Sequence, residues 1–344
     1  MLLYSSFYLL VCFFTWFLTG KLLSYALRKK LLDVPNERSL HANPTPRGGG
    51  VSVVVVFILG LCILVFSDFL SVTNFISFTC AALLVSVVGF IDDHGHVPAR
   101  WRILVHVSAA LLLVFMLRGI PGLIVLGFEI NLSALGYPIA IVYLVWLLNL
   151  YNFMDGIDGL ASMEAICVCI GASICSFIIQ QCSLTESSIV SMLLASSVAG
   201  FMIWNYPPAK IFMGDACSGF LGLVLGALSL LAVWENSAML WCWIILLAVF
   251  ITDATMTLFR RVVSGEKIYE AHRNHAYQHA ATYFGSHLPV VLAVVLINTL
   301  WLFPMALFVA LDMIDGLIAI IISYTPLLVI AYKFNSGISV IERR

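Results

Sequence analysis

A short polar segment that directly follows a long apolar run holds the residues best suited to chemistry in this chain. In NLYNFMDGIDGL (149–160), Asn149 and Asn152 are three residues apart, and Asp155 and Asp158 repeat that spacing. Residues three apart share a face if the segment is helical, and the glycine after each aspartate lets a ligand approach the backbone closely. Amide and carboxylate oxygens are hard ligands that suit Mg²⁺. The segment therefore predicts a magnesium site.

Two more carboxylate motifs lie at the ends of apolar runs. Asp92 and Asp93 are adjacent at the end of one run, where they could be a solvated cap or could handle a metal or a phosphate. The motif FMGD (212–215) precedes another run and is weak alone. Beside the first segment, Asp215 offers a further metal ligand, and the Phe212 ring offers a surface on which a nucleobase could stack.

Basic residues collect in the polar segment 259–287, which contains Arg260, Arg261, His272, Arg273, His275 and His279. Arginine suits bidentate contacts with phosphate. The three histidines fall at i, i+3 and i+7, so they would share one face of a helix and could bind zinc. However, no Cys lies nearby, and hard oxygen ligands dominate the other motifs. A clamp for a pyrophosphate is therefore the better interpretation.

Two other basic segments are candidates for anion binding. In RSLHANPTPRGGG (38–50), glycine-rich backbone lies next to Arg47 and could cradle an anion, although a plain turn is the alternative. In DDHGHVPARWR (92–102), Arg102 follows the paired carboxylates. We assign Arg47, Arg102 and Asn149 to substrate binding.

One ionisable residue, Asp253, lies inside an apolar run. Such a residue is a functional candidate by default, because a charge within the bilayer is costly. It could instead be a structural tie to Arg260 or to another basic side chain. The sequence leaves both interpretations open.

The elements that must position these residues are membrane helices. The chain is 62% hydrophobic and 10% charged, with a mean hydropathy of +1.05, whereas soluble domains are about 25% charged. Continuous apolar runs favour helices over barrel strands, which alternate. The net charge of −1, without a basic patch, argues against nucleic-acid binding. We predict eleven spans: 2–20, 49–67, 73–91, 103–118, 135–152, 160–181, 188–204, 216–234, 238–258, 288–310 and 314–332.

The distribution of Lys and Arg predicts the orientation. With the N-terminus outside, every one of the 17 basic residues except Arg118 falls on the cytoplasmic side. We therefore expect an all-α, polytopic bundle with a periplasmic N-terminus and a cytoplasmic C-terminus. We expect one domain, 1–344, and a small hairpin at 118–134 on the outer side. The cytoplasmic loops that would carry catalysis are 21–48, 92–102, 153–159, 205–215 and 259–287.

In this order between spans, the motifs DD, NxxNxxDGxDGL and FMGD and a His-rich loop resemble the polyprenyl-phosphate N-acetylhexosamine-1-phosphate transferase superfamily. The resemblance runs from about residue 33 to residue 278. It implies that Asn152 and Asp215 are Mg²⁺ ligands, and that Asp155 and Asp158 surround the metal and the uridine. It also implies that Phe212 stacks on uracil.

The same resemblance assigns the remaining motifs. Asp92 and Asp93 would position or deprotonate the lipid phosphate, and His272, Arg273 and His275 would grip the sugar and pyrophosphate. The cofactor would be Mg²⁺, with Mn²⁺ as an alternative. The substrates would be a UDP-N-acetylhexosamine and undecaprenyl phosphate, and UMP would be released at the cytoplasmic face of the bacterial inner membrane. A homodimer is compatible with this family.

Two departures from the family pattern bear on the substrate and the backbone. The last loop reads AHRNHAYQHA, without the run of three histidines of the phospho-MurNAc-pentapeptide translocase, which argues against a pentapeptide substrate. It resembles instead the branch that starts O-antigen synthesis with UDP-GlcNAc or with a 6-deoxy sugar such as UDP-N-acetylfucosamine or UDP-N-acetylquinovosamine. Cys217 stands where the family usually has glycine.

Alternatives from other classes remain. A secondary transporter would also have many spans and a few acidic residues, but its site would lie near the midplane of the bilayer. The segment DGIDGLA superficially resembles the CDP-alcohol phosphotransferases, but the rest of their motif is absent. Within the superfamily, the pentapeptide translocase is the second possibility.

Overall fold

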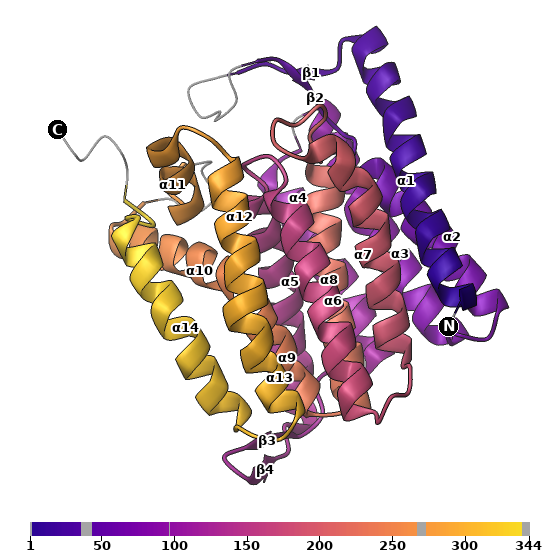
Figure 1. Ribbon diagram of the computed structural model, residues 1–344, viewed down its shortest axis with the longest axis vertical. Helices are drawn as coiled ribbons and strands as arrows, with labels where there is room; N and C mark the ends of the chain where they lie inside the picture. The colour runs from indigo at the N-terminus through magenta and orange to yellow at the C-terminus, as the bar shows by residue number, and fades with distance from the viewer. Residues whose placement is uncertain (1, 36–42, 96, 267–272, 339–344) are drawn as a thin grey trace.

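The computed structural model is a bundle of helices that run roughly side by side (Figure 1), and it describes residues 2–35, 43–95, 97–266 and 273–338. The long helices are α1 (Leu2–Lys29), α3 (Val72–His94), α4 (Ala99–Leu117), α5 (Gly136–Met154), α6 (Leu160–Ile179), α7 (Glu186–Asn205), α8 (Asp215–Glu235) and α14 (Gly316–Lys333). A further long helix consists of α12 (Leu288–Ile297), the π-helical turn η2 (Asn298–Leu302) and α13 (Phe303–Ala310).

The remaining elements are shorter. They are α2 (Val51–Phe66), α9 (Ala238–Leu246), α10 (Ala248–Val263), α11 (Ala276–Phe284) and the 3-10 turn η1 (Ser133–Leu135). Two antiparallel hairpins pair β1 (Leu32–Asp33) with β2 (Thr45–Pro46) and β3 (Leu123–Val125) with β4 (Phe128–Ile130). The second of these hairpins confirms the one predicted at 118–134.

Helix α8 forms the centre of the bundle. Its apolar stretch is completely buried, whereas α1, α4 and α14 expose most of theirs. Three of its glycines face α5, and a Cβ added at Gly222 would come within 2.5 Å of the Leu147 carbonyl oxygen. Small residues let membrane helices approach this closely, which maximises their van der Waals contact.

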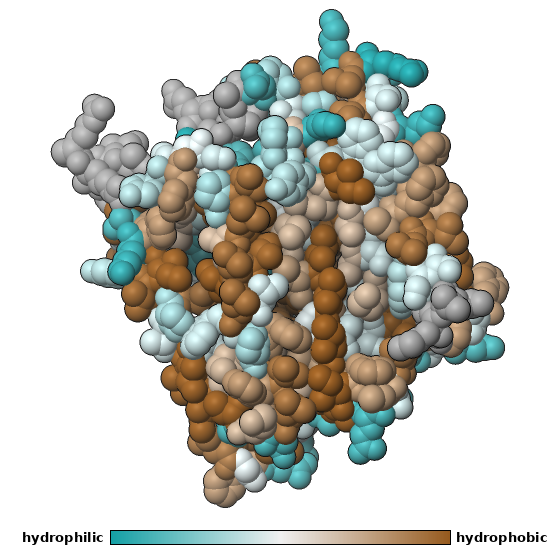
Figure 2. Space-filling view, in the orientation of Figure 1, coloured by the Kyte–Doolittle hydropathy of each residue, from teal (hydrophilic) through white to brown (hydrophobic). Residues whose placement is uncertain are grey.

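The surface of the bundle is that of a membrane protein. In Figure 2, hydrophobic side chains cover most of the visible face between the two ends, where hydrophilic side chains gather. Among the described residues, nine helices are long and apolar enough to cross a bilayer, and the bent pair α9–α10 makes a tenth candidate. The chain is therefore a multi-pass membrane protein.

The eleven predicted spans all fall on apolar helices, but one of these helices is short and another predicted span is a bent pair of helices. The segment predicted at 49–67 is α2, which has only 16 residues. The segment predicted at 238–258 is two helices, α9 and α10, that meet at an angle of 68°. Figure 1 shows α10 lying crosswise to the long helices, below α11, instead of continuing along the bundle.

The loops predicted to carry catalysis meet at one end of the bundle. Figure 1 shows β1, β2 and α11 at the upper end, and the hairpin β3–β4 at the opposite end. Helices α3 and α5 finish at this upper end, and α8 begins there. The side of the membrane on which this end lies stays a prediction from the distribution of basic residues.

Candidate active site

The junction of α3 with α8 is held by a carboxylate that caps a helix. Asp93 accepts hydrogen bonds from the backbone N–H groups of Asp215 (2.9 Å) and Ala216 (3.2 Å), two of the donors that a helix N-terminus leaves unpaired. Gly214 has φ +84°, and a Cβ there would lie 2.6 Å from Asp93. A Cβ on Gly89 would lie 2.4 Å from the Asp215 carbonyl oxygen. Asp93 thus fixes where Asp215 begins its helix.

Arg47 bridges the two carboxylates at this junction. Its Nε lies 2.9 Å from Asp93 Oδ1, and its Nη2 lies 2.9 Å from Asp215 Oδ1. Burial alone would lower the pKa of Arg47, but the charges of Asp215 and Asp93 outweigh burial and raise that pKa. The guanidinium therefore stays charged and partly neutralises the cluster.

The glycine-rich segment that carries Arg47 is anchored to the FMGD motif. Phe212 donates its backbone N–H to the Pro46 carbonyl (2.8 Å), and Gly49 donates back to the Phe212 carbonyl (2.9 Å). A Cβ on Gly50 would come within 2.3 Å of the Cys217 Cβ. The Cys217 side chain therefore occupies space that Gly50 leaves empty, which explains how α8 accommodates this departure from the family pattern.

Asn152 and Asp155, at the end of α5, complete the carboxylate cluster. Asn152 donates from Nδ2 to Asp215 Oδ1 (3.3 Å) and to Ser218 Oγ (2.8 Å), so its amide oxygen is left for another partner. Asp155 caps α5, and its carboxylate accepts no hydrogen bond from the described residues. Burial, followed by the charge of Asp215, raises the pKa of Asp155 well above its usual range.

This donor set fits a hard divalent cation. Among the described residues, no three His, Cys, Asp or Glu side chains lie close enough together to hold a metal by themselves. Mg²⁺ does not need such a cage, since it is typically held by one or two carboxylates together with waters and substrate phosphates. The carboxyl oxygens of Asp155 and Asp215 and the Asn152 amide oxygen supply hard oxygen ligands for it.

A cavity of about 680 Å³, here called the membrane groove, opens from the cluster between α3, α4 and α5. Its polar lining residues are Asp92, Arg100, Arg102, His106, Asn149, Asn152 and Asp215. Arg102 Nη1 lies 2.5 Å from Asp92 Oδ2, and the Val97 N–H donates to the other Asp92 oxygen. The rest of the lining is mostly apolar, from residues such as Ile103, Val107, Ile141, Val142 and Trp146.

A second cavity of about 550 Å³, here called the polar cavity, lies beside the FMGD motif. Its lining residues include Asn43, Thr45, Asp158, Pro207, Pro208, Phe212, Arg273, Thr282 and His287. Asp158 accepts from the Ala209 N–H (3.0 Å) and lies 3.1 Å from His287 Nδ1. The structure thus brings the predicted residues Asp158, Phe212 and Arg273 together in one cavity, away from the apolar groove.

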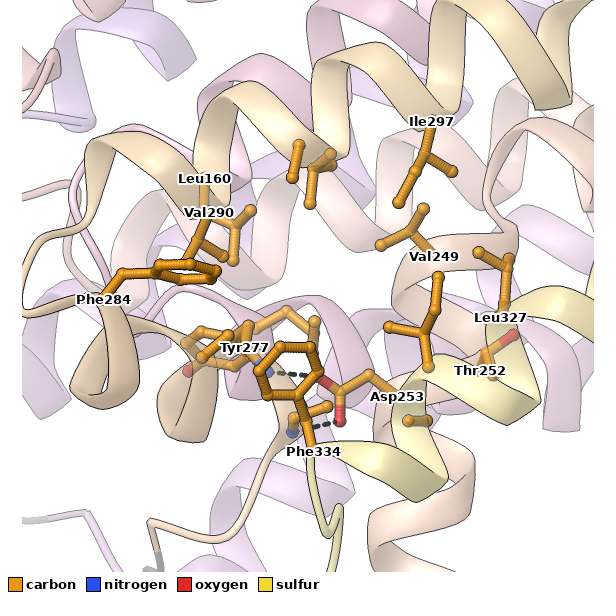
Figure 3. Close-up of a pocket in the computed structure, with 17 residues that line it drawn as sticks. Leu160, Val249, Thr252, Asp253, Tyr277, Phe284, Val290, Ile297, Leu327 and Phe334 are labelled. Atoms are coloured by element: carbon orange, nitrogen blue, oxygen red, sulfur yellow. Dashed lines mark hydrogen bonds between the residues drawn. The ribbon is translucent and has the colours of Figure 1, made fainter.

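His275 lies in neither cavity, although it was predicted to grip the substrate. Its side chain is 2% exposed, and its Nδ1 lies 3.5 Å from Asp253 Oδ1. Asp253 also accepts the backbone N–H groups of Ala276 (2.8 Å) and Tyr277 (3.0 Å), as the dashed lines in Figure 3 mark. These contacts cap α11, so His275 supports the fold of the loop. His272 lies outside the described residues.

The same contacts decide between the two interpretations of Asp253. It is a structural tie, but its basic partner is His275, and Arg260 instead donates to the Ser336 carbonyl (2.8 Å). Figure 3 shows Asp253 at the edge of a small cavity whose other labelled side chains, such as Phe284 and Leu327, are mostly apolar.

Helix α11 is in turn fixed to the carboxylate loop. Tyr277 donates its hydroxyl to the Phe153 carbonyl (3.0 Å), and a Cβ on Gly156 would lie 2.0 Å from that hydroxyl. This close approach explains one glycine of the DGIDG motif.

Sequence reasoning missed several polar side chains that line these cavities, including the histidines His287 and His106. His287 is the last residue of the predicted loop 259–287 and belongs to none of the motifs. His106 lies inside an apolar run, one helical turn after Arg102. Neither spacing nor composition distinguishes these two residues from ordinary membrane-helix histidines.

The chain matches the family model described as glycosyl transferase family 4 over residues 75–233. It is 27% identical over 277 residues to a probable undecaprenyl-phosphate N-acetylglucosaminyl 1-phosphate transferase of Bacillus subtilis, covering 79% of this chain and 76% of that protein. It is 28% identical over 322 residues to a decaprenyl-phosphate N-acetylglucosaminephosphotransferase of Mycolicibacterium smegmatis, covering 82% and 76%.

A third relative is named for a muramoyl-pentapeptide substrate. The chain is 26% identical over 251 residues to a phospho-N-acetylmuramoyl-pentapeptide-transferase of Streptococcus pneumoniae, covering 69% of this chain and 74% of that protein. The matched region contains Asp92, Asn152, Asp155 and Asp215, the residues around which the site is built. Together with the motifs, these matches show that residues 75–233 of the chain are similar to glycosyl transferase family 4.

Proposed function

We propose that this protein transfers a HexNAc-1-phosphate from a UDP-N-acetylhexosamine to undecaprenyl phosphate and releases UMP. One observation carries the proposal: Asp215 lines an apolar groove along membrane helices, and Phe212 of the same FMGD motif lines a polar cavity. A prenyl chain suits the groove because its surroundings are as apolar as lipid. A nucleotide suits the polar cavity, where Phe212 offers a stacking surface. Both phosphates would then meet at Asp215.

The acceptor phosphate needs little activation. The second pKa of a phosphate monoester is about 6, so the oxygen that attacks the β-phosphorus is already mostly ionised. Asp92 is therefore a positioning group or a weak base, and its ion pair with Arg102 lies at the phosphate end of the groove. Arg102 would hold the acceptor phosphate, and Arg47 would stabilise the charge on the departing UMP.

We propose Mg²⁺ as the cofactor, held by Asn152, Asp155 and Asp215, with Mn²⁺ as a substitute. Bound there, the cation would supply electrostatic stabilisation as negative charge shifts during phosphoryl transfer. The chain's own residues do the rest: Asn152 orients Asp215 through its amide hydrogen, and Asp93 fixes the helix end that carries Asp215.

The relatives and the last loop limit the choice of sugar donor. Two of the relatives are named for N-acetylglucosamine, which supports UDP-GlcNAc as a donor. The loop AHRNHAYQHA supports the branch that starts O-antigen synthesis, with N-acetylfucosamine or N-acetylquinovosamine as the other donors. We place the reaction at the cytoplasmic face of a bacterial inner membrane, because the predicted orientation puts every basic residue except Arg118 on that side.

The test is UMP release by the purified protein in micelles with undecaprenyl phosphate and a panel of UDP-HexNAc donors. We expect release that stops without the prenyl phosphate, stops with a chelator and returns with Mg²⁺ or Mn²⁺. Asp215→Asn should nearly abolish turnover at any Mg²⁺ concentration, and Asp92→Asn should leave more activity. Uptake of a UDP-sugar into proteoliposomes without UMP release would contradict the proposal and favour a transporter.

A further inference from the structure

A histidine outside every motif of the site lies against one of its carboxylates. Nδ1 of His287, the N-cap residue of α12, is 3.1 Å from Oδ2 of Asp158. The two side chains are 14% and 11% exposed, so water screens this contact only weakly. Both residues line the polar cavity together with Phe212.

The hydrogen on His287 Nδ1 points toward the carboxylate. The backbone N–H of Asp158 also lies 3.3 Å from this nitrogen, and one ring nitrogen cannot accept from that group while donating to the carboxylate. A bare lone pair would face a carboxylate oxygen at 3.1 Å, which is repulsive. A hydrogen at Nδ1 instead makes a charge-assisted hydrogen bond at the shorter of the two distances.

This bond leaves one oxygen of Asp158 available to a ligand. Oδ2 receives both His287 and the Ala209 N–H (3.0 Å). Within the described part of the chain, Oδ1 has no hydrogen-bond partner. Asp158 itself lies between the buried Ile157 and Gly159, which has φ +76°. Two contacts from other segments, His287 and Ala209, therefore set the direction of the carboxylate.

We propose that His287 is a positioning residue for the nucleotide: it holds Asp158 so that Oδ1 accepts a hydrogen bond from the base or ribose of the UDP-sugar. The inference rests on the proposed function and adds to it a residue from α12. Because the membrane groove does not include His287, its loss weakens binding of the donor and leaves binding of the prenyl phosphate unchanged.

The test compares His287→Leu with His287→Asn, whose side-chain amide can donate from the place of Nδ1. We expect His287→Leu to raise the KM for the UDP-sugar about 10- to 100-fold, the range for one lost hydrogen bond to a charged group. We expect kcat and the KM for undecaprenyl phosphate to change less than about twofold. His287→Asn should recover most of the loss.

A double variant shows whether His287 acts through Asp158. Because the two side chains form one unit, Asp158→Asn combined with His287→Leu should raise the KM no more than the worse single variant. Multiplied effects would overturn the inference. If His287→Leu does not fold, Asp158→Asn and His287→Asn carry the same comparison.

The control is His94→Leu, which removes an exposed imidazole that lines neither cavity. It should leave both KM values unchanged. If the wild type releases UMP but His287→Leu lowers kcat alone or raises both KM values equally, the inference fails and the proposed function stands. If the wild type releases no UMP with any donor, the proposed function fails, and this inference fails with it.

Discussion

The two adjacent carboxylates at the end of α3 have different environments, so their loss should have different consequences. Asp93 is 3% exposed and accepts two backbone N–H groups at the start of α8, besides its contact with Arg47. Asp92 lines the membrane groove and pairs with Arg102, whose side chain is 35% exposed. We therefore predict that Asp93→Asn destabilises the protein and that Asp92→Asn does not.

The magnitude follows from the number of hydrogen bonds lost. A hydrogen bond to a charged group contributes about 1.5–3 kcal/mol net. Asp93→Asn keeps one acceptor oxygen and loses the other, so it should cost about 1.5–3 kcal/mol, and Asp93→Ala should cost about twice that. Asp92→Asn keeps its acceptor for Val97 and loses only a partly solvated ion pair, worth about 0–1 kcal/mol.

Turnover should also fall more in Asp93→Asn than in Asp92→Asn. Asp93 determines where Asp215 lies, and a displacement of about 1 Å in a catalytic group can cost on the order of 100-fold in rate. The measurements are unfolding in detergent micelles and UMP release at saturating substrates. The reasoning is refuted if Asp93→Asn unfolds like the wild type while Asp92→Asn is the destabilised variant. The helix cap would then contribute nothing to the free energy of unfolding.

Three further predictions concern other contacts. Glu164 Oε2 accepts a hydrogen bond from Asn298 Nδ2 (2.6 Å) inside the bundle; Glu164→Gln, which keeps an acceptor, should preserve thermal stability, and Glu164→Leu should cost about 1–3 kcal/mol. Gly50→Ala should cost about 1–3 kcal/mol in unfolding, because its Cβ would overlap Cys217; adding Cys217→Gly should restore part of that stability. Phe212→Leu should raise the KM for the UDP-sugar about 10-fold, since stacking on a base is worth about 1–3 kcal/mol; an unchanged KM would argue against stacking.

The sequence predicted the parts of the site that lie at the ends of apolar runs. Asn152 and Asp215 are 63 residues apart in the chain, yet their side chains lie within 3.3 Å of each other. Their meeting was predictable because the bilayer limits where polar residues can lie: acidic residues at the ends of spans collect at one surface. The different environments of Asp92 and Asp93 were not predictable. The two residues are adjacent and of the same type, so they differ only in what packs against them.

The sequence did not distinguish the positions of two histidines, for a physical reason. His275 and His287 lie in one segment, and the family resemblance pointed to His275 as a substrate contact. In the structure His275 is buried against Asp253, and His287 lines the polar cavity. A histidine serves equally well as a buried partner of a carboxylate or as a ligand contact. Only the packing of α11 and α12 decides which of these two roles His275 and His287 each take.

The bend between α9 and α10 shows why Asp253 could not be interpreted from its position in an apolar run. No Pro or Gly occurs in 238–258, so nothing local predicts a turn of 68°. The bend turns α10 crosswise to the long helices beneath α11, so Asp253 reaches the first N–H groups of α11 instead of facing lipid. Tyr277 then contacts the Phe153 carbonyl beside the carboxylate loop. An acidic residue in an apolar run thus supports the site through a second helix.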